Sequence, residues 1–201
     1  MRRPDYDRRV AVTGLGIVSP VGTTVDTAWE NLVNGVSGLK LITRWDPEVT
    51  TCHAAGEVND FDPKEWMNFK AVRRTDKNVV FGVAAAKQAL GDSGFEIDEE
   101  NAEEVGVYFG SGVGGPGLMA DAIESLEKKG NKGVSPFFIA NMLPDTASGQ
   151  IAIELGAKGP NMAIVTACST GTHNIGEAAE AIRRGDFIAG VCGSTETPLY
   201  E

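Results

Sequence analysis

The chain has 201 residues, the size of one ordinary domain, and its 42% hydrophobic content is enough to build a core. Its net charge of -10 argues against a general nucleic-acid binder. Three cysteines without CxxC spacing indicate neither a disulfide framework nor a zinc site, and no apolar run approaches the ~20 residues that cross a bilayer, so an untargeted, cytoplasmic protein is predicted.

The first 35 residues are expected to form a strand, a turn-rich loop and a helix. Residues 9–13 alternate toward an apolar strand, and glycines punctuate residues 14–22. A strand before Gly-x-Gly also occurs in dinucleotide-binding folds, but Ser19 occupies the third glycine position and Pro20 follows it. Thr24 is typical of an N-cap, and Trp29, Leu32 and other apolar residues fall on one face of the following helix.

The middle of the chain combines a basic segment with buried elements. Residues 64–77 are rich in Lys and Arg in an otherwise acidic chain, and an ordinary solvated surface is the simplest interpretation. Residues 79–90 are apolar nearly all round and predict a buried helix, and residues 105–109 predict a buried strand. The adjacent Cys52 and His53 have no further ligands nearby, so no metal site is predicted.

Glycine-rich residues 110–117 require backbone that turns sharply or approaches another group closely. A phosphate cradle is one interpretation, but the Lys-Ser/Thr pair that completes a P-loop is missing. Two helices follow in the prediction. One covers residues 121–129, and the other covers residues 145–155, with Pro144 at its start and Gly156 at its end.

Cys168 lies where a strand is predicted to end and a helix to begin. Residues 162–165 predict a short buried strand, and the spacing of Ile175, Ala178 and Ile182 predicts a helix that ends at Gly185. The first turn of a helix has unpaired N–H groups and a partial positive charge, which favour a thiolate and can bind the oxyanion of a tetrahedral intermediate. The alternative is a small, buried and inert cysteine. A further strand is predicted for residues 187–192 and a turn for residues 193–198.

The segment Thr-Ala-Cys-Ser-Thr-Gly-Thr-His-Asn-Ile-Gly, residues 166–176, closely resembles the nucleophile motif of the elongating β-ketoacyl-[acyl carrier protein] synthases. Residues 12–22 resemble the opening segment of the same condensing enzymes. The resemblance implies a thiolase-like, five-layered αβαβα fold, with a mixed sheet and a buried helix after the nucleophile. It also implies a 3-oxoacyl synthase of fatty acid biosynthesis, in which Cys168 carries the acyl chain as a thioester and malonyl-acyl carrier protein then condenses with it. No cofactor and no metal is implied.

Other site residues follow from the resemblance alone. Gly112 and Val113 match residues that line the acyl pocket, and Phe138 matches one that reaches this pocket from a partner subunit. The matches to positions that dock the acidic acyl carrier protein are Lys70, Arg73, Arg74 and Lys132. Ser194 departs mildly from the family, which usually has a glycine there.

The resemblance covers the N-terminal half of such an enzyme over residues 1–201. The two His and the Lys that stabilise the enolate in the family belong to its other half, and His173 is predicted to be a packed structural residue. We therefore expect this chain to be incomplete for condensation, and either a fragment or obliged to associate, as a homodimer or with a C-terminal-half chain. Two alternatives stay open: a non-catalytic partner that resembles a chain-length factor, and a nucleotide-binding α/β domain suggested only by the glycine loops.

Overall fold

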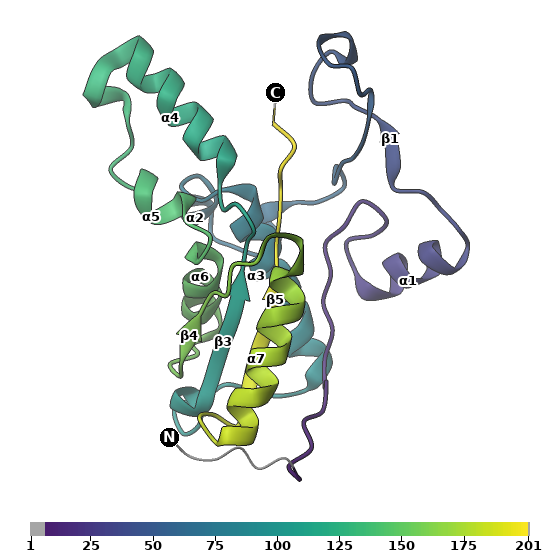
Figure 1. Cartoon of the computed structure of the whole chain (residues 1–201), viewed down its shortest axis with the longest axis vertical. Helices are drawn as coiled ribbons and strands as arrows, with labels where there is room; N and C mark the ends of the chain where they lie inside the picture. The colour runs from purple at the N-terminus through teal and green to yellow at the C-terminus, as the bar shows by residue number, and fades with distance from the viewer. Residues whose placement is uncertain (1–6, 201) are drawn as a thin grey trace.

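A three-stranded parallel sheet forms the centre of the computed structural model, which describes residues 7–200 (Figure 1). The strand order is β4-β3-β5, with β3 at Val105–Gly110, β4 at Asn161–Met162 and β5 at Ala189–Ser194. In the register, Val107 lies opposite both Asn161 and Val191. Every residue of β3 is buried, which confirms the predicted buried strand and agrees with a sheet covered on both faces.

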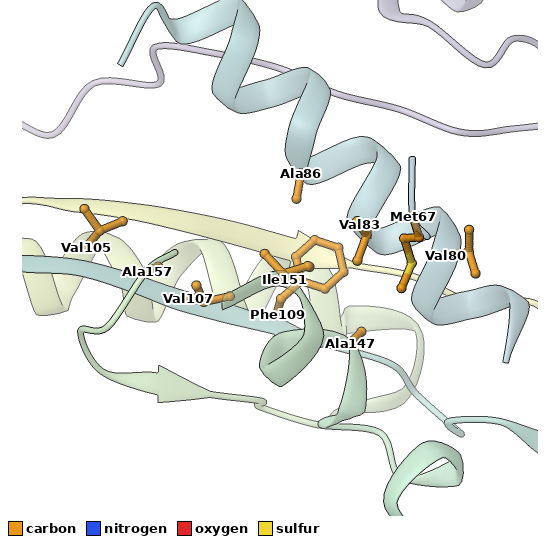
Figure 2. Close-up of a cluster of buried hydrophobic side chains, with 10 residues drawn as sticks. All are labelled: Met67, Val80, Val83, Ala86, Val105, Val107, Phe109, Ala147, Ile151 and Ala157. Carbon is orange, nitrogen blue, oxygen red and sulfur yellow. The ribbon is translucent and has the colours of Figure 1, made fainter. Parts of the chain in front are cut away.

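Helices α3 (Lys77–Ser93) and α6 (Thr146–Leu155) cover one face of this sheet. Alternate residues of β3, Val105, Val107 and Phe109, point to that face, because side chains in a strand alternate in direction. They pack with Val83 of α3 and Ile151 of α6, both fully buried (Figure 2). The predicted buried helix over residues 79–90 is therefore confirmed.

Helix α7 (Thr170–Arg184) covers the opposite face of the sheet (Figure 1). Tyr108 of β3 packs there with Ala178 and Ala181 of α7 and with Phe187. The helix ends at Gly185, whose φ of 76° is left-handed, as predicted. The side of α7 away from the sheet is open, and Ile175 is exposed although the predicted apolar face included it.

The N-terminal segment lies beside α3 and forms no strand between residues 9 and 13, so the predicted strand is wrong. The backbone N–H of Leu15 donates to Asp92 and that of Ile17 donates to Gln88, both on α3. Helix α1 (Val25–Val33) has the predicted N-cap, since Thr24 accepts from the N–H of Thr27. Its apolar face is open, however, because only Ala28 is buried.

The remaining elements are short, apart from α4 (Pro116–Lys129), which starts five residues before the predicted helix with Pro116 in its first turn. The strands β1 (Leu39–Leu41) and β2 (Ala54–Gly56) pair antiparallel, so parallel and antiparallel pairing occur in separate sheets. The short helices are α2 (Phe69–Val72), α5 (Phe138–Met142), η1 (Pro47–Val49), η2 (Pro63–Glu65), η3 (Ala102–Glu104), η4 (Gly130–Gly133) and η5 (Ala167–Ser169). Within residues 7–200, no helix combines the length and the apolar character that a membrane crossing requires.

Candidate active site

Cys168 lies in η5, immediately before α7, and it is exposed. No side chain caps the first turn of α7, and the N–H of Thr170 donates to the carbonyl of Ala167. The positive end of the α7 dipole lies beside the sulfur, where it favours an anion. This position confirms the predicted joint before the helix. The preceding strand is shorter and more exposed than predicted, because β4 ends at Met162 and Val165 is exposed.

The backbone directly before Cys168 is strained. Ala167 has a φ of 53°, and it is the one residue other than glycine with a positive φ in the described chain. A left-handed conformation costs a residue with a Cβ about 1–2 kcal/mol, so the surrounding contacts must hold it in place. One such contact is the hydroxyl of Ser169, which donates to the carbonyl of Thr166 over 2.8 Å.

Side chains in the first turns of α7 form hydrogen bonds with the segment that leads to Cys168. The N–H of Thr166 donates to the hydroxyl of Thr170 over 2.9 Å, and the Nδ1 of His173 lies 2.6 Å from the hydroxyl of Thr166. His173 is exposed, so the prediction of a packed histidine is wrong. Its partner is Thr166 rather than the thiol of Cys168, and the structure thus gives it an orienting contact in the nucleophile turn.

The glycine-rich loop after β3 packs against the same turn. A Cβ placed on Gly112 would lie 3.3 Å from both the Cα and the carbonyl oxygen of Ala167, tighter than an ordinary contact. The structure therefore places Gly112 next to the residue that precedes Cys168, while the side chain of Val113 is exposed. The buried hydroxyl of Ser111 accepts from the N–H of Gly114 over 2.8 Å and shapes the loop.

Sequence reasoning missed Glu196, which follows the end of β5. One of its carboxylate oxygens accepts from the N–H of Gly112 over 2.8 Å, and the other accepts from the hydroxyl of Ser111 over 3.1 Å. The sequence indicated only a turn here. One signal could have identified Glu196: it is an acidic residue after the carboxyl end of β5. This strand is parallel to β3, which the glycine loop follows.

Phe138 lies in α5 and lines a cavity of about 110 Å³ between α4 and α5. Arg74 and Phe137 line the same cavity, and the Arg74 guanidinium lies 4.5 Å from the centre of the Phe137 ring. None of the residues that line this cavity belongs to the Cys168 turn. Its expected place in the pocket of a partner subunit involves a second chain and stays a prediction.

The predicted docking residues gather around α2. Lys70, Arg73 and Arg74 are exposed, and the Arg73 guanidinium lies 5.6 Å from the centre of the Phe69 ring. Lys132 is exposed in η4, next to Gly133, which lines the cavity with Arg74. None of these four cations forms an ion pair with another residue of the described range 7–200, so their charges are available to a partner.

No group of three or more His, Cys, Asp and Glu side chains within residues 7–200 is placed to hold a metal ion. Cys52 is exposed, and its sulfur contacts the carbonyl oxygen of Ala54 over 3.4 Å.

A parallel sheet between helices, with a cysteine at a helix tip and a glycine loop packed on its turn, is the α/β arrangement of the thiolase-like enzymes. Residues 7–201 match the family described as beta-ketoacyl synthase, N-terminal domain, and the chain belongs to this family.

Known proteins similar to the chain agree with this assignment. It is 45% identical over 193 residues to 3-oxoacyl-[acyl-carrier-protein] synthase 2 of Staphylococcus aureus (strain COL), a match that covers 96% of this chain and 47% of the relative. It is 47% identical over 195 residues to the protein of that name from Coxiella burnetii, again covering 96% of this chain and 47% of the relative. The chain thus spans about half the length of the curated relatives it matches.

Solved structures of ketosynthases have the same fold. The ishigamide ketosynthase/chain length factor aligns with a TM-score of 0.84 at 28% identity, covering 94% of this chain and 48% of that chain. A type II polyketide ketosynthase, solved with its acyl-carrier protein and bound to a hexaketide, aligns with a TM-score of 0.77 at 26% identity, covering 92% of this chain and 50% of that chain. These likenesses confirm the predicted α/β, thiolase-like fold class.

Proposed function

We propose that residues 1–201 form the N-terminal half of a 3-oxoacyl-[acyl carrier protein] synthase, and that Cys168 is its acyl-carrying nucleophile. The observation that carries this proposal is the exposed Cys168 at the uncapped tip of α7, with Gly112 packed against the preceding residue. The 45% identity to a named synthase over 96% of the chain supports it.

The chemistry begins with transfer of the acyl group. The Cys168 thiolate attacks the thioester carbonyl of an acyl-carrier protein, and the negative charge moves to the carbonyl oxygen. As that intermediate collapses, the new carbon–sulfur bond to Cys168 stays, the bond to the pantetheine sulfur breaks, and the released pantetheine thiolate takes up a proton. The positive end of the α7 dipole, beside the sulfur, is suited to stabilise the oxyanion.

Condensation proper is proposed only for the whole enzyme. Loss of carbon dioxide from malonyl-acyl carrier protein leaves an enolate that needs hydrogen-bond donors. The family supplies two His and a Lys, which correspond to no residue of this chain. The Nδ1 of His173 contacts the hydroxyl of Thr166, and His53 lies in the exposed stretch before β2. Neither histidine therefore replaces the two His of the family.

The acyl chain is proposed to extend from Cys168 along the glycine loop, past Gly112 and Val113. Phe138 from a second copy would close the far side of this pocket, in agreement with its position on the short helix α5. A homodimer is supported by the open edge of the sheet, since Asn161 and Met162 of β4 are exposed and pair only with β3. Association with a C-terminal half is supported by the open apolar faces of α1 and α7.

The partner is proposed to be an acidic acyl carrier protein that docks on Lys70, Arg73, Arg74 and Lys132. Exposed cations without acidic partners in the described chain attract an acidic protein and steer its approach. The ketosynthase neighbour was solved in complex with its acyl-carrier protein, which supports this kind of partner. A cytoplasmic location agrees with the three cysteines, which are all free thiols.

The competing function is that of a non-catalytic partner similar to a chain-length factor, because one structural neighbour is a ketosynthase/chain length factor. Such partners usually carry Gln where the enzymes carry the nucleophile. The exposed thiol of Cys168 therefore favours the enzyme.

Mass spectrometry of the purified protein after incubation with an acyl-carrier protein thioester tests the proposal. We expect one acyl group per chain, attached to Cys168 and absent from the exposed Cys52, and no acylation of the Cys168→Ser variant. Equal labelling of Cys52 and Cys168, or no labelling at all, would contradict an activated nucleophile and favour the non-catalytic partner.

A further inference from the structure

Glu196 joins the two loops that meet at the carboxyl end of the sheet. Its Oε2 accepts from the backbone N–H of Gly112 over 2.8 Å, and its Oε1 accepts from the hydroxyl of Ser111 over 3.1 Å. Ser111 in turn accepts from the N–H of Gly114 over 2.8 Å and is 1% exposed. A single carboxylate thus fixes the orientation of consecutive peptide units in the glycine loop.

The clamp formed by Glu196, Ser111 and Gly112 lies in contact with the nucleophile turn. A Cβ on Gly112 would meet the Glu196 carboxylate at 2.9 Å and the backbone of Ala167 at 3.3 Å. Gly112 therefore lies between the carboxylate and the residue that precedes Cys168. A shift of the Gly112 peptide would open the contact that supports Ala167 from this side.

The backbone that carries Glu196 is itself anchored on both sides. Thr195 is buried, its N–H donates to Gly110 over 3.0 Å, and its hydroxyl donates to the carbonyl of Asn78 over 2.6 Å. Thr197 is also buried, and its hydroxyl donates to Asp76 over 3.1 Å. The carboxylate is thus held from the start of α3, which makes it a rigid support although its own side chain is exposed.

A rigid support is needed because Ala167 has a left-handed φ of 53°. A residue with a Cβ keeps such a conformation only when its surroundings determine it from several directions. The contacts of Thr166 with Thr170 and His173 come from α7, and the contact of Gly112 with Ala167 comes from the glycine loop.

We propose that Glu196 is a positioning residue for acyl transfer to Cys168: through Gly112 it holds the Ala167 turn that presents the sulfur. The inference rests on the proposed function for the reaction itself, but the positioning of the sulfur is measurable without it. Glu196 does not touch the reacting atoms, so it acts on the reactivity of the thiol and not as an acid or a base.

The test compares the purified protein with its variants Glu196→Ala and Glu196→Gln. Each is purified together with every segment and subunit that accompanies the chain in the cell. Iodoacetamide alkylation of Cys168 and Cys52 is followed in the same sample by peptide mass spectrometry. Cys52 is exposed and does not belong to the clamp, so it serves as the internal standard. Glu99→Ala, at an exposed carboxylate after α3, is the matched control variant, and thermal unfolding by circular dichroism verifies folding.

We expect Glu196→Ala to slow alkylation of Cys168 about tenfold, because small displacements of a reacting group have large effects on rate. The amide of Glu196→Gln can still accept from Gly112, so its rate should lie between those of Glu196→Ala and the unmodified protein. The Cys52 rate and the Glu99→Ala protein should be unchanged.

An unchanged or faster Cys168 rate in Glu196→Ala would overturn the proposal, as would a parallel change at Cys52, which would indicate general unfolding. A measurement of acyl transfer from an acyl-carrier protein thioester distinguishes the positioning role of Glu196 from the proposed function of Cys168. If the unmodified protein takes up no acyl group while Glu196→Ala still slows alkylation of Cys168, the positioning role stands and the proposed function fails.

Discussion

The side chain of Asn174 pairs with both backbone groups of Ile164. The N–H of Ile164 donates to Asn174 Oδ1 over 3.1 Å, and Asn174 Nδ2 donates to the Ile164 carbonyl oxygen over 3.1 Å. Asn174 lies on α7 and is 0% exposed. Ile164 lies in the predicted strand over residues 162–165, where a neighbouring strand would have paired with its backbone. The side chain of Asn174 on α7 makes these hydrogen bonds instead.

Replacing Asn174 by Leu should destabilise the fold and displace Cys168. Leucine fills a similar volume but leaves the N–H and the C=O of Ile164 without partners, which should cost at least about 2 kcal/mol. Urea unfolding measures this loss, and Glu177→Ala, at an exposed position on the same helix, should change stability by less than about 0.5 kcal/mol. Equal stabilities of the two variants would show that the Asn174 pairing contributes little.

Replacing Gly112 by Ala should impair acylation of Cys168 more than it impairs folding. The added methyl group would lie 3.3 Å from the Ala167 backbone and 2.9 Å from the Glu196 carboxylate, so the loop, the turn or the carboxylate must shift to make room. We expect acyl transfer to fall about tenfold to a hundredfold, measured by mass spectrometry. Gly91→Ala is the control, because its methyl group meets no atom within 4 Å. A Gly112→Ala protein that is acylated at the normal rate would refute close packing of the loop on the nucleophile turn.

The sequence predicted best the elements whose pattern is local. The strand at residues 105–109, the helix over residues 79–90 and the end of α7 at Gly185 agree with the structure, because burial on all sides and a C-terminal glycine leave clear traces in the sequence. Cys168 was located for the same reason, since its turn joins a short apolar run to a helix.

The failures concern groups whose partners lie far away in the chain. Residues 9–13 have the composition of a strand but form none, and the residues that follow, Leu15 and Ile17, donate to side chains of α3 and not to a neighbouring strand. Glu196 is separated from its partner Gly112 by 84 positions, and only the parallel pairing of β3 with β5 brings them together. Propensity and periodicity do not encode such a meeting.

Phe187 packs so closely on the sheet that Gly106 has no room for a side chain. A Cβ on Gly106 would lie 2.7 Å from the Phe187 ring, and one on Gly190 would lie 2.9 Å from it. We expect Gly106→Ala to destabilise the protein by about 1–3 kcal/mol through overpacking. In urea unfolding, adding Phe187→Leu should recover part of this loss, so the double variant should cost less than the sum of the single changes. Strict additivity would contradict a direct clash.

Charge reversal at Arg73 or at Arg74, each as a single variant, should weaken binding of an acidic acyl carrier protein about tenfold or more at low salt, with a smaller effect at high salt. The matched control is Lys158→Glu, an exposed cation next to Gly159, whose N–H donates to Val105 at the opposite end of β3 from the glycine loop. Surface plasmon resonance at two salt concentrations measures these variants. If Lys158→Glu weakens binding as much as the Arg73 and Arg74 changes, net charge and not a docking surface governs the interaction.

Tyr200 should make stability depend on alkaline pH. Burial raises the pKa of the Tyr200 hydroxyl from 10.0 to about 12, and the Asp76 carboxylate, which accepts from this hydroxyl over 2.8 Å, acts in the same direction. The folded state therefore holds the proton more tightly than the unfolded chain does. The stabilisation is complete below pH 10 and is lost as the pH rises through about 12. The free energy of unfolding in urea should thus fall more steeply across this window in the unmodified protein than in Tyr200→Phe. Parallel curves for the two proteins would mean that Tyr200 ionises equally easily in both states.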